Sequence, residues 1–111
     1  TLFPYTTLFR SSRPSWFGFL ISVKPDSGLD RNAIVRRLEA ANIQTRLLFS
    51  GNIIRHPCFE SIRGTDAYRV VGELTNTDYI VEHTFWVGVY PGLTEPMIDY
   101  MARSILEAVQ A

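Results

Sequence analysis

Apolar side chains recur at every second position in two stretches of the chain, residues 16–23 (WFGFLISV) and 84–90 (TFWVGVY). A period of two is typical of a β-strand, because successive side chains point to opposite faces of a sheet. A further strand is predicted over residues 44–49 (QTRLLF). The opening strand is fairly apolar on both faces, which favours cover on both sides.

Residues 30–41 repeat their apolar side chains with the period of an α-helix, and Ile34 and Leu38 share one face. Asp30 suits the positive N-terminal end of this helix. Asn42 suits the left-handed conformation that often follows a helix, with an apolar residue after it. The solvent side is expected to carry Arg31, Arg36, Arg37 and Glu39.

Two further helices are expected in the second half of the chain. One covers residues 77–83, with Thr75 or Asn76 as its cap, and the other follows a cap at Thr94. The predicted order is strand, helix, strand, irregular segment, short helix, strand, helix, which gives an α+β fold with a small sheet covered by helices. The core stripe of the last helix is expected to comprise Met97, Ile98, Met101, Ile105 and Val109.

Composition restricts the function classes that remain. The 111 residues leave room for one domain, and 46% hydrophobic with 20% charged residues is ordinary for a globular protein. Eleven basic and eleven acidic residues give a formal charge of zero, so there is no basic excess to bind nucleic acid. No apolar run approaches the ~20 residues of a membrane-spanning helix.

The single cysteine, Cys58, excludes an internal disulfide and an all-cysteine metal site. Because it lies between Pro57 and Phe59, we expect it to be a small buried apolar residue. One reduced cysteine fits a cytoplasmic location, which is the expectation here.

Residues 1–11 (TLFPYTTLFRS) resemble the in-frame translation of a common short-read sequencing adaptor. We therefore set them apart from the fold as an adaptor-derived artefact, and expect native sequence from about Ser12. On this hypothesis residues 12–111 are a fragment of a longer protein. The alternative is a genuine apolar N-terminus, although Pro4 and the lack of a basic start argue against a signal peptide.

The segment 45–59 (TRLLFSGNIIRHPCF) carries the candidate ligand-binding groups. Guanidinium, amide and imidazole groups near a turn suit an anionic ligand rich in hydroxyl groups. The alternative is that the arginines are solvated or bind local carbonyl groups, as most loop arginines do. The candidate substrate-binding residues are Arg46, Asn52, Arg55 and His56.

The other reactive residue types form no complete active site. Lys24, the one lysine, precedes Pro25 at a strand end and is poorly placed for a buried Schiff base. His83 ends a predicted helix, where a structural role is expected. The carboxylates scatter over solvated faces and turns. The residues alone predict no catalytic group, no metal site and no bound cofactor, only ligand contacts.

From Pro14 onward the sequence resembles the C-terminal small domain of the DegT/StrS family, whose members have the aspartate-aminotransferase-type fold (fold type I) and depend on pyridoxal phosphate (PLP). The phrases RLLFSGNIIRHPCF and NTDYIVEHTFWVGVYPGLT are similar to the CDP-4-dehydro-6-deoxyglucose 3-dehydratase branch found in lipopolysaccharide gene clusters. The resemblance implies that this domain closes over a cofactor pocket and contacts a CDP-sugar substrate.

The same resemblance implies the chemistry of the parent enzyme. That branch uses pyridoxamine phosphate (PMP) and an iron–sulfur cluster to remove the C3 hydroxyl of a CDP-4-keto-6-deoxyhexose, on the way to the 3,6-dideoxysugars of O-antigen. Its members carry this machinery in a large domain, work as homodimers and receive electrons from a reductase. The isolated chain is accordingly expected to be inactive and to bind neither cofactor.

Two alternatives stay open at this point. The chain could derive from a PLP-dependent sugar aminotransferase, which keeps a lysine where the dehydratase has a histidine. It could instead be a stand-alone α+β binding module without catalysis. A fragment should expose an apolar patch where the large domain packs, whereas a stand-alone module should not.

Overall fold

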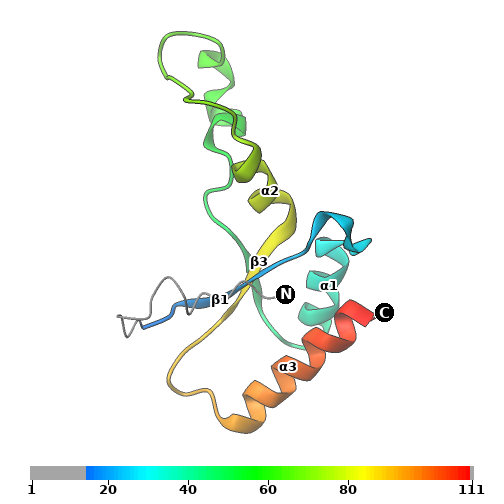
Figure 1. The fold of residues 1–111 in the computed structure, drawn as a ribbon. Helices are drawn as coiled ribbons and strands as arrows, with labels where there is room; N and C mark the ends of the chain where they lie inside the picture. The colour runs from blue at the N-terminus through cyan, green and yellow to red at the C-terminus, as the bar shows by residue number, and fades with distance from the viewer. Residues whose placement is uncertain (1–14, 111) are drawn as a thin grey trace.

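The structure, a computed structural model, describes residues 15–110. Three strands form one antiparallel sheet: β1 (Gly18–Ser22), β2 (Thr45–Leu47) and β3 (Thr84–Gly88). The strand order is β1-β3-β2, so the last strand lies between the first two. The strands β1 and β3 are labelled in Figure 1. All three predicted strands are confirmed, each shorter than its predicted range.

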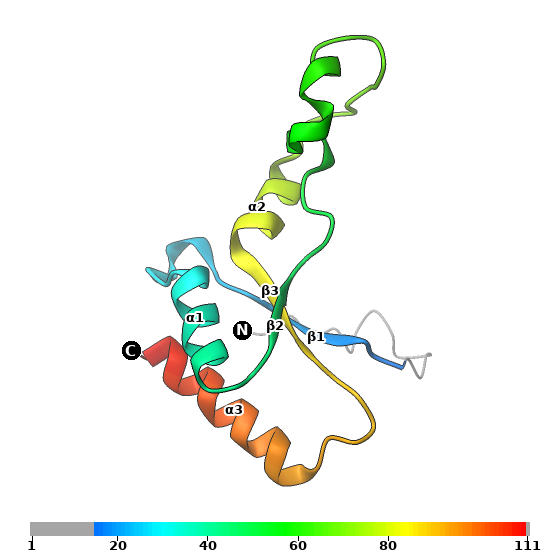
Figure 2. The same ribbon diagram turned by 180° about the vertical axis from the view of Figure 1, so that it is seen from behind.

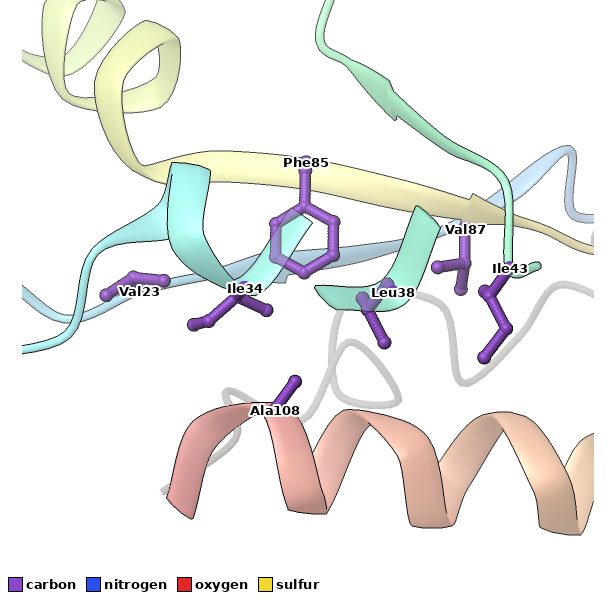
Figure 3. Packing of buried hydrophobic residues seen from close by; sticks show 7 residues of the cluster. All are labelled: Val23, Ile34, Leu38, Ile43, Phe85, Val87 and Ala108. Carbon is purple, nitrogen blue, oxygen red and sulfur yellow. The ribbon is translucent and has the colours of Figure 1, made fainter. Parts of the chain in front are cut away.

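Two helices, α1 (Arg31–Ala40) and α3 (Glu95–Gln110), lie next to each other beside the sheet (Figure 2). Phe85 points from the central strand toward these helices, and Val87 lies on the same face of β3 (Figure 3). Both side chains are buried, as alternation along this strand predicted. The buried apolar core consists of Val23, Ile34, Leu38, Ile43, Phe85, Val87 and Ala108.

Both ends of α1 follow from the sequence. The Asp30 carboxylate accepts hydrogen bonds from the backbone N–H groups of Asn32 and Ala33, which caps the N-terminus. Asn42 has a left-handed φ of 59°, and the N–H of Ile43 bonds to the carbonyl of Leu38. This reversal turns the chain toward β2 and buries Ile43.

Arg31 was expected to face solvent, and this prediction was wrong. Its side chain is buried, Nη1 donates to the carbonyl of Thr84 at 2.9 Å, and Nε donates to Asn32 Oδ1 at 2.8 Å. The arginine thereby joins the start of α1 to the start of β3. A burial of this kind needs partners for the guanidinium, and one of them, the Thr84 carbonyl, lies 53 residues along the chain.

The chain between β2 and β3 extends away from the sheet as an arm (Figures 1 and 2). It contains two 3₁₀ segments, η3 (Ile53–Arg55) and η4 (Pro57–Ile62), and then the helix α2 (Thr75–His83), while a third 3₁₀ turn, η2 (Pro25–Ser27), follows β1. The helix α2 starts earlier than predicted, after Leu74, and no side chain caps it, so the predicted cap was wrong.

Three expectations about burial need correction. Cys58 is exposed, because it lies in η4 on the arm, away from the core. Met97 and Ile98 are about half exposed, so the core stripe of α3 begins only at Met101. The buried residues of α3 are the small ones, Ser104 and Ala108, and Ala108 belongs to the same core cluster as Ile34 and Leu38 of α1.

Many large apolar side chains of the described residues stay exposed, including Phe19, Leu47 and Phe49. Leu20 lies on the opposite face of β1 from Phe19 and is 38% exposed, so the described residues do not supply the cover on both faces that the sequence predicted. None of the helices within residues 15–110 is long and apolar enough to cross a membrane.

Candidate functional site

An open cavity of about 600 Å³ lies where the chain leaves β2 and enters the arm. One wall is apolar and is formed by the end of β2 and by Val81 of α2. The polar part of the lining comes from the predicted ligand-binding segment. The cavity is lined by Leu47, Leu48, Phe49, Ser50, Gly51, Asn52, Arg55, His56 and Val81.

The loop beneath the cavity is held by its own histidine. The ring Nε2 of His56 lies 2.6 Å from the carbonyl oxygen of Ser50, and because a carbonyl only accepts, Nε2 carries the proton and donates. Gly51 between them has a left-handed φ of 74°, a conformation that glycine adopts without strain. His56 therefore shapes this loop as well as lining the cavity.

Asn52 and Arg55 meet on one carboxylate, that of Asp78 in the first turn of α2. The Asn52 Nδ2 donates to Asp78 Oδ1 at 2.7 Å, and Arg55 Nη2 lies 2.6 Å from Asp78 Oδ2. Asn52 is buried, with 6% of its surface exposed, whereas the Arg55 side chain is 63% exposed. The pair thus joins a fixed amide to a cation that solvent and ligand can reach.

Arg46 lies apart from this group. It is on β2 opposite Trp86, its side chain is exposed, and its Nη1 donates to the carbonyl of Thr45 at 2.9 Å. It is absent from the lining of the cavity. The structure therefore brings together Asn52, Arg55 and His56, and leaves Arg46 on the sheet.

Sequence reasoning missed Asp78. The residue lies 23 positions beyond Arg55, and an acidic residue in the first turn of a helix already has an explanation in the helix dipole. The one available signal was its position in the phrase NTDYIVEHTFWVGVYPGLT, the second of the two phrases that carry the family resemblance.

The geometry supports binding of a polar, anionic ligand and little else. Arg55 offers a cation, Asn52 an amide, and the end of β2 an apolar wall. Within residues 15–110, no three side chains of His, Cys, Asp or Glu gather into a metal-binding group. Lys24 is exposed and does not line the cavity, so the lining offers no amine for a Schiff base with PLP. We therefore assign no reaction step to that cofactor within this chain.

The arrangement is that of a small α+β domain found in PLP-dependent enzymes. In the solved structure titled E. coli GDP-4-keto-6-deoxy-D-mannose-3-dehydratase with bound hydrated PLP, the matching part has a TM-score of 0.68 and 27% identity, over 79% of this chain and 22% of that chain. A GDP-4-keto-6-deoxymannose-3-dehydratase with a trapped PLP-glutamate geminal diamine gives a TM-score of 0.69 and 29% identity, over 81% and 22%.

Residues 2–106 match the model of the DegT/DnrJ/EryC1/StrS aminotransferase family, and the chain belongs to that family. It is 56% identical over 98 residues to a dTDP-4-dehydro-2,6-dideoxy-D-glucose 3-dehydratase of Saccharopolyspora spinosa, covering 88% of this chain and 20% of the relative. It is 53% identical to the lipopolysaccharide biosynthesis protein RfbH of Salmonella typhimurium, covering 88% and 22%. The chain thus spans about a fifth of the length of these relatives.

The family match extends into residues 1–11, which the sequence analysis set apart as adaptor-derived. Those residues lie outside the described part of the structure. The adaptor interpretation, and with it the division of the chain at Ser12, stays a prediction.

Proposed function

We propose that this chain is the small domain of a PMP-dependent sugar-nucleotide 3-dehydratase that acts on a CDP-4-keto-6-deoxyhexose in 3,6-dideoxysugar synthesis for O-antigen. The observation that carries this proposal is the cavity at the start of the arm. Its polar residues belong to a segment of a chain that is 53% identical to RfbH, and they offer a cation and an amide beside an apolar wall.

In this proposal the domain closes the cofactor pocket and holds the substrate. Arg55 binds a phosphate oxygen of the sugar nucleotide, because a guanidinium matches phosphate geometry. Asn52 bonds to a sugar hydroxyl, and His56 holds the loop in place. Arg46 reaches the substrate only from outside the cavity lining, which makes it the weakest of the four assignments.

The remaining parts of the machinery belong to the rest of the enzyme. The residues that would hold the cofactor belong to the large domain, and there the cofactor would supply an amine for the C4 ketone. An iron–sulfur cluster, a reductase that feeds it, a homodimeric assembly and a cytoplasmic location are all part of the proposal. Their support is the family resemblance of the two quoted phrases.

A dTDP-linked sugar is the second candidate substrate. It is favoured by the relative from Saccharopolyspora spinosa, whose name specifies a dTDP-linked 2,6-dideoxyglucose and whose identity to this chain is 56%. The cavity does not discriminate between these nucleotides, because Arg55 would bind a phosphate in either one.

The test is an assay of the complete protein that contains this chain. The purified enzyme, with PMP and a reductase, is offered the CDP-linked 4-keto-6-deoxy sugar and, separately, the dTDP-linked 4-keto-2,6-dideoxy sugar. Cleavage of the C3–O bond releases water, and two electrons with two protons then complete the product. We expect mass spectrometry to find a product that has lost one oxygen atom.

The same assay tests the alternatives. Transfer of an amino group from glutamate, in which the C4 ketone oxygen is exchanged for an amino group and the C3 hydroxyl is kept, would show an aminotransferase. Binding without conversion of any sugar nucleotide would favour a non-catalytic binding module. Either result would overturn the proposed dehydration.

A further inference from the structure

Asp78 holds the two ligand-facing groups of the cavity at once. One carboxylate oxygen accepts a hydrogen bond from Nδ2 of Asn52 at 2.7 Å. The other accepts one from Nη2 of Arg55 at 2.6 Å. The Asp78 side chain is only 27% exposed, although its arginine partner is 63% exposed. The carboxylate therefore lies behind the two residues, on α2, and does not itself line the cavity.

The charge of Asp78 decides the orientation of the Asn52 amide. An ionised carboxylate accepts hydrogen bonds and cannot donate, so the amide must turn its NH₂ group toward Asp78. Its carbonyl oxygen, Oδ1, is thereby directed away from the carboxylate. Because Asn52 lines the cavity, this oxygen, beside the second N–H of the amide, is left to meet a ligand.

Arg55 is held at one end by the same carboxylate. A guanidinium has five N–H donors in a planar fork, and the contact with Asp78 engages its Nη2 end. The fork is thus fixed in direction while much of it stays open to solvent. A cation held in this way loses less conformational freedom when it binds an anion than one on a free side chain.

We propose that Asp78 is a positioning residue that gives the cavity its polarity, with an acceptor oxygen from Asn52 beside a directed guanidinium from Arg55. Such a site takes a ligand that carries a hydroxyl donor next to an anionic group, which is the chemistry of a sugar linked to a phosphate. This inference rests on the proposed function, because its clearest readout is substrate affinity.

The test uses the complete enzyme with Asp78→Asn, Asp78→Glu and Asp78→Ala. Asparagine has one acceptor oxygen in place of two, so it cannot orient both partners. We expect Asp78→Asn to raise KM for the sugar nucleotide about tenfold or more while kcat changes little, because Asn52 and Arg55 would no longer both be held in the orientation that binds the ligand. Asp78→Glu keeps the carboxylate and should recover part of the affinity. Glu82→Gln, an exposed carboxylate on the same helix, is the matched control and should leave KM unchanged.

A double-mutant cycle separates positioning from a general structural effect. If Asp78 acts through Arg55, Asp78→Ala should raise KM much less in an Arg55→Ala background than in the wild type. Purely additive effects, or equal KM values for the wild type and Asp78→Asn, would overturn the assignment. A wild-type enzyme that converts no sugar nucleotide would instead overturn the proposed function, so the two failures are distinguishable.

Discussion

The indole of Trp86 lies directly over Gly18 on the neighbouring strand. A Cβ atom built at Gly18 would come within 2.5 Å of Cε3 of Trp86 and within 3.0 Å of Cδ2. Gly18 pairs with Gly88 in the sheet, two positions beyond Trp86, and a Cβ at Gly88 would meet nothing within 4 Å. The indole also contacts Phe17, with ring centroids 5.0 Å apart. A glycine is therefore needed at position 18 on β1, whereas position 88 on β3 has room for a side chain.

Gly18→Ala should accordingly destabilise the protein, by about 1–3 kcal/mol, because the indole or the strand must shift to admit the methyl group. Gly88→Ala is the matched control, and should be neutral or raise stability by up to ~1 kcal/mol through reduced freedom of the unfolded chain. Chemical denaturation of both variants measures the difference. Equal effects of the two substitutions would contradict this packing.

A similar pair tests the core. Leu38 on α1 is completely buried, whereas Leu106 on α3 is 58% exposed. Leu38→Ala should reduce the free energy of unfolding by about 2–5 kcal/mol, since it removes buried methyl groups and leaves a cavity. Leu106→Ala should change it by less than ~1 kcal/mol. A smaller loss for Leu38→Ala than for Leu106→Ala would show that α1 does not cover the sheet as described.

The link between α1 and β2 should depend on pH. Glu39 Oε1 accepts hydrogen bonds from both Oγ1 and the backbone N–H of Thr45, at 2.7 and 2.9 Å. These bonds lower the pKa of Glu39 below its ordinary value, and the bond from the Thr45 hydroxyl has the larger effect. Because the folded pKa is the lower one, the stabilisation is present above the unfolded pKa and is lost as pH falls through the folded value.

Glu39→Gln should therefore be less stable than the wild type at neutral pH, and the difference should shrink as acid protonates Glu39. The effect is modest, since the carboxylate is exposed. Thermal unfolding of both proteins across the acid range measures it, with Glu107→Gln on α3 as an exposed control. A difference that does not change with pH would mean that the Thr45 contact does not favour the ionised form.

Arg55 should contribute to substrate affinity in the complete enzyme. Arg55→Ala is expected to lower kcat/KM by about tenfold to a hundredfold, because it removes a charge-assisted hydrogen bond to phosphate. Arg69→Ala, which removes an exposed arginine elsewhere on the arm, is the control. Unchanged kinetics of Arg55→Ala would remove this residue from the site.

Local patterns predicted most of the fold. The helical spacing of Ile34 and Leu38 and the alternation around Phe85 identified core residues correctly, because both patterns report which face of an element is buried. Asp30 and Asn42 predicted the ends of α1, since capping depends on residues next to the helix. The family expected from the two quoted phrases is confirmed as well.

Contacts between distant residues were not predictable in this way. The burial of Arg31 depends on a carbonyl 53 positions later, and the pairing of Asn52 and Arg55 with Asp78 spans 26 and 23 positions. Each of the charged residues, Arg31, Arg55 and Asp78, has an ordinary local explanation as a solvated or dipole-stabilising charge. Only the fold, by bringing α2 beside the loop, joins Asn52, Arg55 and Asp78 into one group.

The central claim is that this chain is the small domain of a sugar-nucleotide 3-dehydratase, and sequencing the source DNA upstream of the codon for Ser12 tests it most directly. We expect the reading frame to continue upstream into a large domain with a histidine at the position of the Schiff-base lysine and with clustered cysteines. A lysine at that position would contradict the claim in favour of an aminotransferase. A start codon next to Thr1 would contradict it in favour of a stand-alone binding module.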